Sequence, residues 1–350
     1  WPVSGAPIRR ASVERWACLA ALPTALLLAG CPDEEACSGG WAPVFEDLDR
    51  SILSATERDG EVFLAGGSLG GPAGAAALRW DGARWHELDT GREDTLWWVW
   101  AEPGGDELWF VGEGGLALHR DGAGFTAVDT GTEATLYGVW GSAADDVWLV
   151  GGVPGEAGVD DDVVVLHWDG SAITRDDTVP IADVALFKVW GAAAADVWVA
   201  GERGTMLHHT AAGWTDLSGE LDTVSSVLTV HGCAADEVYA TAGSELFRWA
   251  GDRWGVVDEV APLGLMNEVS CGAAGVLAVG IGGLKLRWDR AAATWFDEQL
   301  ERPWDTDYHG ALVAARTSSE NSNTACAGPR AGAICACVAP PSGGACAKRS

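Results

Sequence analysis

A single short motif recurs along this chain, and its spacing constrains the fold more than any other feature. The motif is an apolar residue, then usually an aromatic one, then a small one, and its middle residue serves as the anchor of a repeat. Successive anchors lie 40, 50, 41 and 40 residues apart. A period of this length indicates an array of supersecondary units. The copies are Val99-Trp100-Ala101, Val139-Trp140-Gly141, Val189-Trp190-Gly191, Val230-His231-Gly232 and, less clearly, Ser270-Cys271-Gly272.

Each repeat has the pattern of four short strands. The first ends at the anchor, and the second carries an apolar–aromatic pair such as Val147-Trp148, with Gly151 three residues beyond. The third ends in a turn such as Trp168-Asp169-Gly170, and Asp-Gly is a typical hairpin dipeptide. Apolar and polar residues alternate at period two, which favours strands over helices. An aromatic residue opens the fourth strand at Phe125, Trp214, Trp254 and Trp295.

Four strands in about 40 residues predict a blade of a β-propeller. An earlier anchor at Ala55 and a first strand at Gly310–Ala314 extend the array in both directions. We therefore predict an all-β, seven-bladed β-propeller of four-stranded repeats. The stretch 41–45 is expected to close the last blade as its fourth strand. The seventh blade is expected to be incomplete, because the pattern stops at Arg316. A stacked β-solenoid is the alternative, although its repeats are usually shorter.

The repeat unit, with its Val-Trp-Gly, Asp-Val-Trp and Leu-His-Trp-Asp-Gly segments, resembles kelch-like and BNR-like propeller lipoproteins of bacterial envelopes. The resemblance covers residues 41–315. It implies a propeller but no particular activity, because propellers carry many different functions.

The first thirty residues have the organisation of a signal peptide. Three basic residues, Arg9, Arg10 and Arg15, precede an apolar run over 16–28. This run is too short to span a bilayer as a helix. The run ends in Leu28-Ala29-Gly30-Cys31, which resembles the lipobox of bacterial lipoproteins. The resemblance implies that Cys31 is lipidated. Several acyl chains on one residue make a stable membrane anchor.

The chain is therefore divided into four segments. Residues 1–30 are predicted to be a lipoprotein signal peptide, 31–40 a lipidated polar tether and 41–315 the propeller. Residues 316–350 are predicted to be an irregular tail, and a slipped reading frame is the favoured cause. The expected location is the bacterial cell envelope, with the lipoprotein facing the periplasm or the cell surface.

The formal net charge of −29 falls in the body of the chain, because both ends are net basic. Such a body repels phosphate backbones, so nucleic acid is not an expected partner. A well-solvated surface on a monomer explains the charge. Attraction to divalent cations or to a basic ligand is the alternative.

Histidines and arginines recur at one position of the repeat. Residues at equivalent positions are spread around a ring, so a structural role is favoured over a shared metal site. The residues are His119, His167 and His208, with Arg79, Arg248 and Arg287 at the same position in other repeats.

The insertion 153–162 carries Glu156, Asp160, Asp161 and Asp162. Clustered carboxylates can bind Ca²⁺, but the spacing does not match an EF-hand. These residues are weak metal candidates, and a solvated acidic loop is the favoured interpretation. This insertion and another at 68–76 fall between the second and third strands, and per-repeat insertions often mark a binding face.

We predict no catalytic residue and no cofactor other than this weakly supported Ca²⁺. The Ser-x-Asp-x-Gly-x-Thr-Trp box of sialidase-type propellers is missing, and arginine is sparse. Cys233 and Cys271 fall in the first strands of neighbouring repeats, so a disulfide between them is open in an exporting compartment.

The predicted function is that of a membrane-anchored lipoprotein whose propeller is a non-catalytic binding or scaffold module for a protein or glycan at the cell envelope. The alternative is a polysaccharide-active hydrolase or lyase with a propeller active site. Acids and aromatic residues from several blades that converge on the ring centre would mark such a site.

Overall fold

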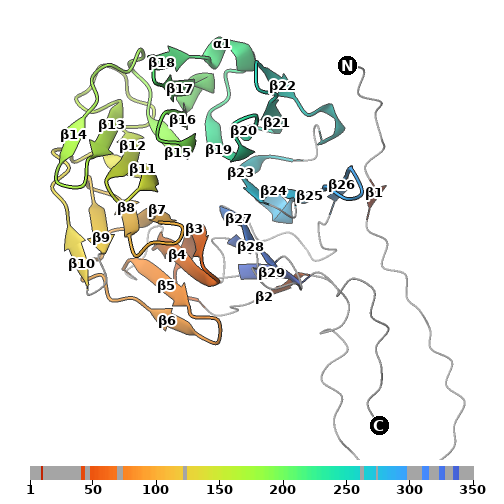
Figure 1. The fold of residues 1–350 in the computed structure, drawn as a ribbon, viewed down its shortest axis with the longest axis horizontal. Coiled ribbons are helices and arrows are strands. Elements are labelled where there is room, and N and C mark those ends of the chain that lie inside the picture. The colour runs from red at the N-terminus through yellow and green to blue at the C-terminus, as the bar shows by residue number, and fades with distance from the viewer. Residues whose placement is uncertain are drawn as a thin grey trace, which may run out of the picture.

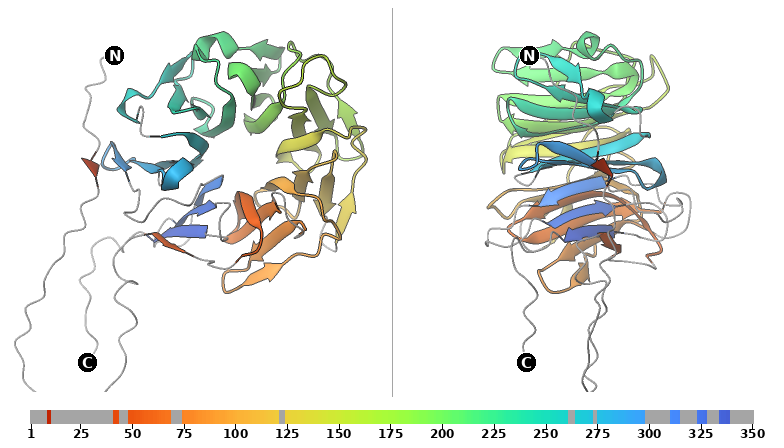
Figure 2. Two further views of the ribbon diagram at one scale, coloured as in Figure 1. Left: turned by 180° about the vertical axis from the view of Figure 1, so that it is seen from behind. Right: turned by 90° about the vertical axis from the view of Figure 1, so that its right-hand side faces the viewer.

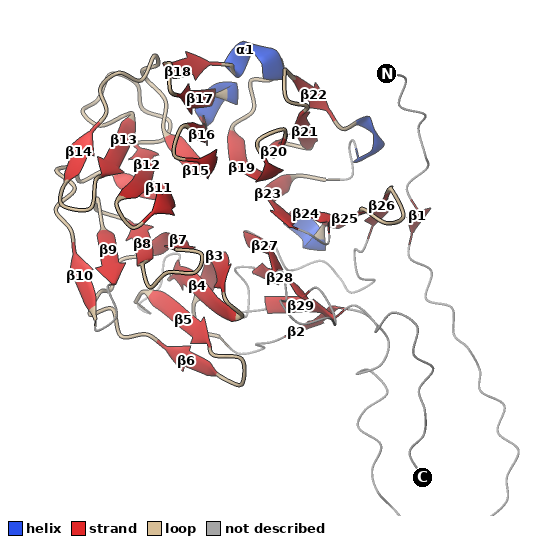
Figure 3. Ribbon diagram, in the orientation of Figure 1, coloured by secondary structure: helices blue, strands red, loops and turns tan. Residues whose placement is uncertain are grey.

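The computed structural model describes residues 9–10, 41–43, 48–68, 74–120, 124–260, 264–272, 275–297, 310–314, 323–327 and 334–338. Antiparallel sheets are arranged in a ring, and the first strand of each repeat lies nearest the centre (Figure 1). Figure 2 shows the same ring from behind and, in its right-hand panel, edge-on. Strands dominate the described part of the chain (Figure 3), which confirms the predicted all-β propeller.

Six four-stranded blades follow one another in chain order. Blade one contains β3 (Ser51–Arg58), β4 (Glu61–Gly67), β5 (Ala76–Trp80) and β6 (Trp85–Glu87). Blade two contains β7 (Leu96–Ala101), β8 (Leu108–Gly112), β9 (Ala117–Arg120) and β10 (Phe125–Ala127). Blade three contains β11 (Thr135–Ala143), β12 (Asp146–Gly152), β13 (Val164–Trp168) and β14 (Ile173–Arg175).

The second half of the ring continues the same order. Blade four contains β15 (Leu186–Ala193), β16 (Asp196–Gly201), β17 (Met206–Thr210) and β18 (Gly213–Asp216). Blade five contains β19 (Val227–Ala234), β20 (Glu237–Ala242), β21 (Glu245–Trp249) and β22 (Trp254–Val256). Blade six contains β23 (Met266–Gly272), β24 (Gly275–Gly280), β25 (Lys285–Asp289) and β26 (Thr294–Asp297), and β1 (Arg9–Arg10) pairs with β26 in parallel. The short helices are η2 (Glu202–Gly204), α1 (Ser218–Leu221), η3 (Asp258–Val260) and η4 (Ile281–Gly283).

The prediction of seven blades, with the seventh incomplete and closed by the N-terminal strand, is wrong, because six four-stranded blades carry the repeat. The prediction counted Gly310–Ala314 as a seventh copy from its first strand alone. The apolar–aromatic pair and the Trp-Asp-Gly-like turn that complete a repeat do not follow it.

The segments beyond the sixth repeat form a sheet of mixed origin. Its strand order is β2 (Trp41–Pro43), β29 (Ile334–Val338), β28 (Asn323–Ala327) and β27 (Gly310–Ala314). β27 lies beside β23 and β3, so this sheet stands between the sixth blade and the first (Figure 1). Two of its strands fall within the predicted tail 316–350. The slipped reading frame stays a prediction.

The hydrophobic core lies between neighbouring blades. Residues of the second strand of one blade pack with the first and third strands of the next, and the cluster around Trp198 of β16 includes Val230, Phe247 and Trp254 of blade five. Trp198 is 0% exposed, and its ring lies 5.0 Å from that of Trp249. This explains the aromatic residue in the second strand of the repeat.

The anchor motif is explained by a second contact between blades. A Cβ atom built on Gly191 would lie 2.5 Å from the Trp140 ring of the preceding blade, and one on Gly232 would lie 2.4 Å from the Trp190 ring. Real Cβ atoms do not approach other atoms that closely, so glycine is required where the anchor indole rests on the next inner strand. Val-Trp-Gly is therefore a contact between blades.

Replacement of Trp198 by alanine is expected to lower the free energy of unfolding by about 3–5 kcal/mol, because the site cannot collapse around so large a void. Chemical denaturation followed by fluorescence measures the effect. Val224 is 90% exposed, and Val224→Ala should change stability by less than about 0.5 kcal/mol. Equal effects of the two substitutions would contradict a core located between blades.

Candidate functional site

Each inner strand is interrupted by a β-bulge at the same point. The pairing of β7 with β8 skips one residue between Leu96 and Trp98, and the other five inner strands skip at the equivalent place. A bulge leaves one residue outside the ladder and redirects its side chain. The bulged residues are Leu53, Trp97, Tyr137, Phe187, Leu228 and Asn267.

All six bulged residues line one cavity of about 400 Å³, hereafter the axial cavity. Since they come from six inner strands, the cavity lies where the blades converge at the ring centre. Trp98, Pro154, Lys188 and Glu268 complete its lining. A volume of this order is typical of ligand sites.

Aromatic rings form a continuous arc along the cavity wall. The ring centroids of Trp97 and Tyr137 are 5.1 Å apart, and those of Tyr137 and Phe187 are 5.5 Å apart, both in edge-to-face geometry. Edge-to-face pairs hold one another in fixed orientations. Three neighbouring blades therefore present a preorganised apolar surface to the cavity. Burial raises the pKa of Tyr137 above its usual value, so its phenol stays protonated.

A buried ion pair lies beside this arc. Lys188 Nζ is 3.0 Å from a carboxylate oxygen of Glu268 and 2.8 Å from the centroid of the Trp98 ring. The Thr229 hydroxyl donates a hydrogen bond of 2.7 Å to the other carboxylate oxygen. Burial lowers the pKa of Lys188 to about 8 and raises the pKa of Glu268. Lys188 therefore keeps its charge at neutral pH, and the pair crosses the ring from blade four to blade six.

The axial cavity offers mainly apolar and aromatic surface, with one buried ion pair. Glu268 is the one carboxylate among the described residues of its lining, and both of its oxygens are already engaged. Hydrolysis of glycosides usually needs two carboxyl groups that flank the scissile bond. The aromatic arc instead suits the burial of apolar groups of a ligand.

The histidines at one repeat position are held apart, each beside an acid of its own blade. His167 Nε2 lies 2.6 Å from Asp146, and His208 Nε2 lies 2.6 Å from Asp196. His119 pairs in the same way with Glu107. The rings of His119 and His208 also stack on Trp109 and Trp198 of the neighbouring strand. This arrangement is structural, as the sequence analysis favoured.

The acidic insertion 153–162 extends from the axial cavity, which Pro154 lines, to the outer strand β14, where Asp161 meets Arg175. Asp161 pairs with Arg175 and accepts a 2.5 Å hydrogen bond from Thr132, and these partners lower its pKa. Asp162 accepts from the Gly158 backbone N–H at 3.1 Å, and Glu156 is exposed. Asp160 lines a shallow acidic pocket together with Asp161. Ca²⁺ binding at these residues stays a prediction.

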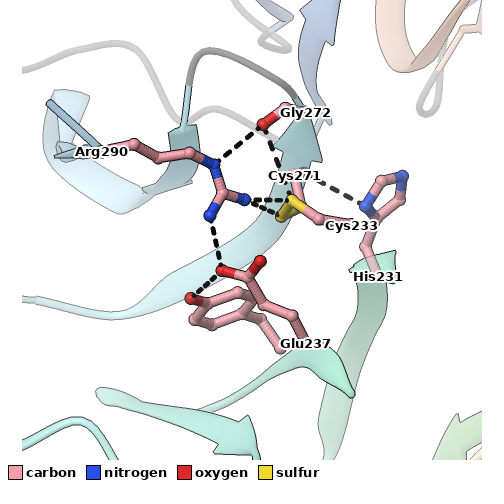
Figure 4. The surroundings of a disulfide bond; sticks show 7 residues. His231, Cys233, Glu237, Cys271, Gly272 and Arg290 are labelled. Atoms are coloured by element: carbon pink, nitrogen blue, oxygen red, sulfur yellow. Dashed lines mark hydrogen bonds and ion pairs between the residues drawn. A yellow bond between two sulfur atoms is a disulfide. The ribbon is translucent and has the colours of Figure 1, made fainter. Parts of the chain in front are cut away.

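Cys233 and Cys271 form a disulfide that joins β19 to β23 (Figure 4). The Arg290 guanidinium lies over the pair, 2.7 Å from Cys233 Sγ and 2.9 Å from a carboxylate oxygen of Glu237. Although the two cysteines and Glu237 lie close enough to share a metal ion, the sulfurs are used in the disulfide and the carboxylate is used by Arg290. This group is therefore a covalent and ionic link between blades five and six.

Cys31, the tether over 31–40 and, apart from Arg9–Arg10, the predicted signal peptide over 1–30 lie outside the described residues, so lipidation of Cys31 stays a prediction. No helix in the described part of the chain has the length and apolar character needed to cross a membrane.

The axial cavity was not among the features predicted from the sequence. Apart from Pro154, its residues stand two and three positions before the anchor position of each inner strand, and they differ between most repeats. The available signal was the aromatic run Trp97-Trp98, together with Tyr137 and Phe187 at the equivalent place. Lys188, a cation in an otherwise apolar strand, was a second signal.

Comparisons with known proteins give the fold. A structure titled YCF48 bound to D1 peptide aligns with a TM-score of 0.61 and 13% identity, over 85% of this chain and 96% of that one. YCF48 from Cyanidioschyzon merolae aligns with a TM-score of 0.61 and 14% identity, over 85% and 99%. The WD40 propeller domain of Doa1 aligns with a TM-score of 0.64 and 8% identity, over 85% and 96%. The chain is a β-propeller that resembles YCF48. At these identities the likeness concerns the fold alone.

No protein-family model matches the chain. Over 61 residues it is 43% identical to a protein of Schizosaccharomyces pombe whose name assigns it as a monoglyceride lipase. The match spans 17% of this chain and 15% of that protein, so no lipase activity is inferred for this chain from it.

One sequence motif that is found in catalytic sites was not among the sequence predictions. Gly66-Gly67-Ser68-Leu69-Gly70 has the letters of the Gly-x-Ser-x-Gly elbow, in which the serine sits on a turn from a strand into a helix. Here Gly66 and Gly67 end β4, which pairs with the next described strand β5 in an antiparallel blade. Residues 69–73 lie outside the described part. An all-β blade is not the strand-to-helix context that the elbow requires.

Replacement of Lys188 by methionine is expected to destabilise the fold by about 3–5 kcal/mol, because Glu268 is then left buried without a counter-ion. The double variant Lys188→Met with Glu268→Gln should recover much of that loss, since it removes both charges and keeps an acceptor for Thr229. Denaturant unfolding of the wild type, both single variants and the double variant measures the coupling. Strictly additive effects would show that the pair is not coupled.

His231 is expected to make stability depend on pH. Its Nδ1 accepts the Cys271 N–H at 3.1 Å, and burial, with Lys188 nearby, lowers its pKa from 6.5 to about 4. Between these values the unfolded state binds more protons, so stability falls as the pH falls from 6.5 towards 4 and is fully retained above 6.5. The loss is on the order of 3 kcal/mol.

Unfolding curves at pH 7 and pH 5 for wild type and His231→Asn check this expectation. Asparagine keeps an acceptor but does not titrate, and the carboxylates contribute equally to both proteins. The variant should lose less stability between the two pH values. Parallel losses would contradict a neutral, hydrogen-bonded His231.

Proposed function

We propose that this protein is a non-catalytic binding module whose axial cavity receives a segment of a partner protein. The observation that carries the proposal is the set of six bulges, which aim one side chain from every blade at a single cavity. Four of the lining residues are aromatic, and aromatic anchors dominate the energetics of protein recognition.

A protein segment suits the cavity better than a sugar chain does. The wall is mainly apolar and its ionic groups, Lys188 and Glu268, already satisfy each other. The site can therefore bury an apolar or aromatic side chain. It has few free polar groups that could hydrogen-bond to the hydroxyl groups of a sugar. A solved YCF48 propeller of similar fold is bound to a peptide, which supports this mode of use.

The proposal includes the setting of the module. Cys31 would be lipidated and would hold the propeller at the membrane of a bacterial cell envelope, facing the periplasm or the surface. The lipobox-like Leu28-Ala29-Gly30-Cys31 after a signal-like apolar run supports this part. The propeller would then act as a scaffold that captures its partner beside the membrane.

Selection of a random 12-residue peptide library on the propeller tests the binding mode. Peptides that contain aromatic or large apolar residues should be enriched, and Tyr137→Ser or Phe187→Ser should lower their affinity at least tenfold, because either substitution interrupts the aromatic arc. Affinities can be measured by fluorescence anisotropy of labelled peptides.

Val224→Ser, on the exposed surface, is the matched control and should bind as the wild type does. Thermal melting of each variant shows whether the fold is kept. If no peptide is enriched, or if the serine variants at 137 and 187 bind equally well, the axial cavity is not the binding site.

A further inference from the structure

The fifth blade departs from a pairing that the other blades keep. At one position of the third strand, a base pairs with an acid of its own blade: Arg79 with Glu61, His119 with Glu107, His167 with Asp146, His208 with Asp196, and Arg287 with Asp289. Arg248 occupies this position in β21, but no described carboxylate pairs with it. The acid expected to pair, Glu237, instead accepts hydrogen bonds from Tyr239 Oη at 3.0 Å and from Arg290 at 2.9 Å.

The same blade also departs from the aromatic packing. At earlier junctions the second-strand tryptophan contacts a tryptophan of the next blade, with ring centroids 5.4 Å apart for Trp109 and Trp168 and 5.3 Å apart for Trp198 and Trp254. Tyr239 replaces tryptophan in β20. Its smaller ring makes no ring contact with a tryptophan of blade six among the described residues.

These two departures open a groove between blades five and six, hereafter the junction groove. It has a volume of about 260 Å³. Its lining includes Tyr239, Arg248, Arg253, Trp254, Trp288 and Trp295. Arg253 is exposed, and the described residues give its side chain no ion-pair partner. Two guanidinium groups without carboxylate partners therefore share a groove with three indoles, on a protein with a net charge of −29.

We propose that the junction groove binds a uronic acid residue of an acidic polysaccharide. A guanidinium group binds a carboxylate through two parallel hydrogen bonds, which suits Arg248 and Arg253. The half-buried Trp288 ring supplies flat apolar area for the C–H face of a sugar ring, whereas Trp254 and Trp295 are only 5% and 4% exposed and add little surface. An aspartate or glutamate side chain brings a carboxylate without a ring to cover the Trp288 indole.

The acidic body of the protein does not prevent this binding. At physiological ionic strength charges separated by more than about 8 Å are largely screened. The two arginines that line the groove therefore set the local field for a bound carboxylate. The nearby Glu237 is already neutralised by Arg290.

Calorimetric titration of the full chain with a tetramer of galacturonate or glucuronate tests the proposal. The acidic oligosaccharides should bind, and the neutral glucose tetramer should bind at least tenfold more weakly. Arg248→Gln with Arg253→Gln should lower affinity for the acidic tetramers at least tenfold. Tyr239→Trp should do the same without removing a charge, because it restores the indole that fills the equivalent junctions.

Arg79→Gln is the matched control, because Arg79 occupies the same repeat position as Arg248 but is paired with Glu61, and it should leave affinity unchanged. Thermal melting confirms that each variant is folded. The proposal is overturned if the acidic tetramers do not bind the wild type, or if the double arginine variant binds them equally. It is also overturned if inorganic phosphate or a tetraglutamate peptide binds as tightly as the uronates.

Discussion

The contact between a tryptophan of one blade and the next blade is the interaction on which the ring depends. A four-stranded sheet cannot bury both of its faces alone, so each blade must be completed by its neighbours. Trp140 does this by lying against Gly191, and Trp198 by packing among the aromatic residues of blade five. Each contact needs a large ring on one side and a glycine or a matching ring on the other. The repeat therefore recurs along the chain as pairs of positions that contact each other in neighbouring blades.

Because these contacts hold the blades together, other positions are free to vary. The bulged residues of the inner strands take no part in the tryptophan–glycine contacts and are different in most blades, from Leu53 to Trp97 to Asn267. The bulge itself repeats at the equivalent place in all six inner strands, whatever side chain it carries. The repeated bulges thus form the cavity. Because the residues at and next to the bulge vary between blades, one side of the cavity is aromatic and another side is ionic.

The difference between repeated junction positions and variable bulged positions explains how much could be predicted from the sequence. Val-Trp-Gly and Trp-Asp-Gly recur at fixed spacing, so the strands, the propeller and the structural role of His119, His167 and His208 could be predicted. Lys188 and Glu268 are 80 residues apart and meet only when the ring closes. They occupy the same repeat position, after the bulge, but that position holds Gly138 and Thr229 in other blades, so spacing alone does not indicate an ion pair. The blade count was wrong because a single strand-like match at Gly310–Ala314 was treated as a whole repeat.

Blade five shows what happens when the paired positions change together. His231 stands where an anchor tryptophan is expected, and Tyr239 replaces the second-strand tryptophan. In the ladder of β23, Ser270 takes the anchor position, one residue before the anchor expected from the sequence, so Cys271 stands where the next blade needs glycine. Each change alone would weaken the junction. The Cys233–Cys271 disulfide and the Arg290–Glu237 pair join the same two blades across this place. A covalent link can hold blades five and six together without the aromatic packing used elsewhere, and it therefore leaves room for the junction groove, in which the described residues give Arg248 and Arg253 no carboxylate partner.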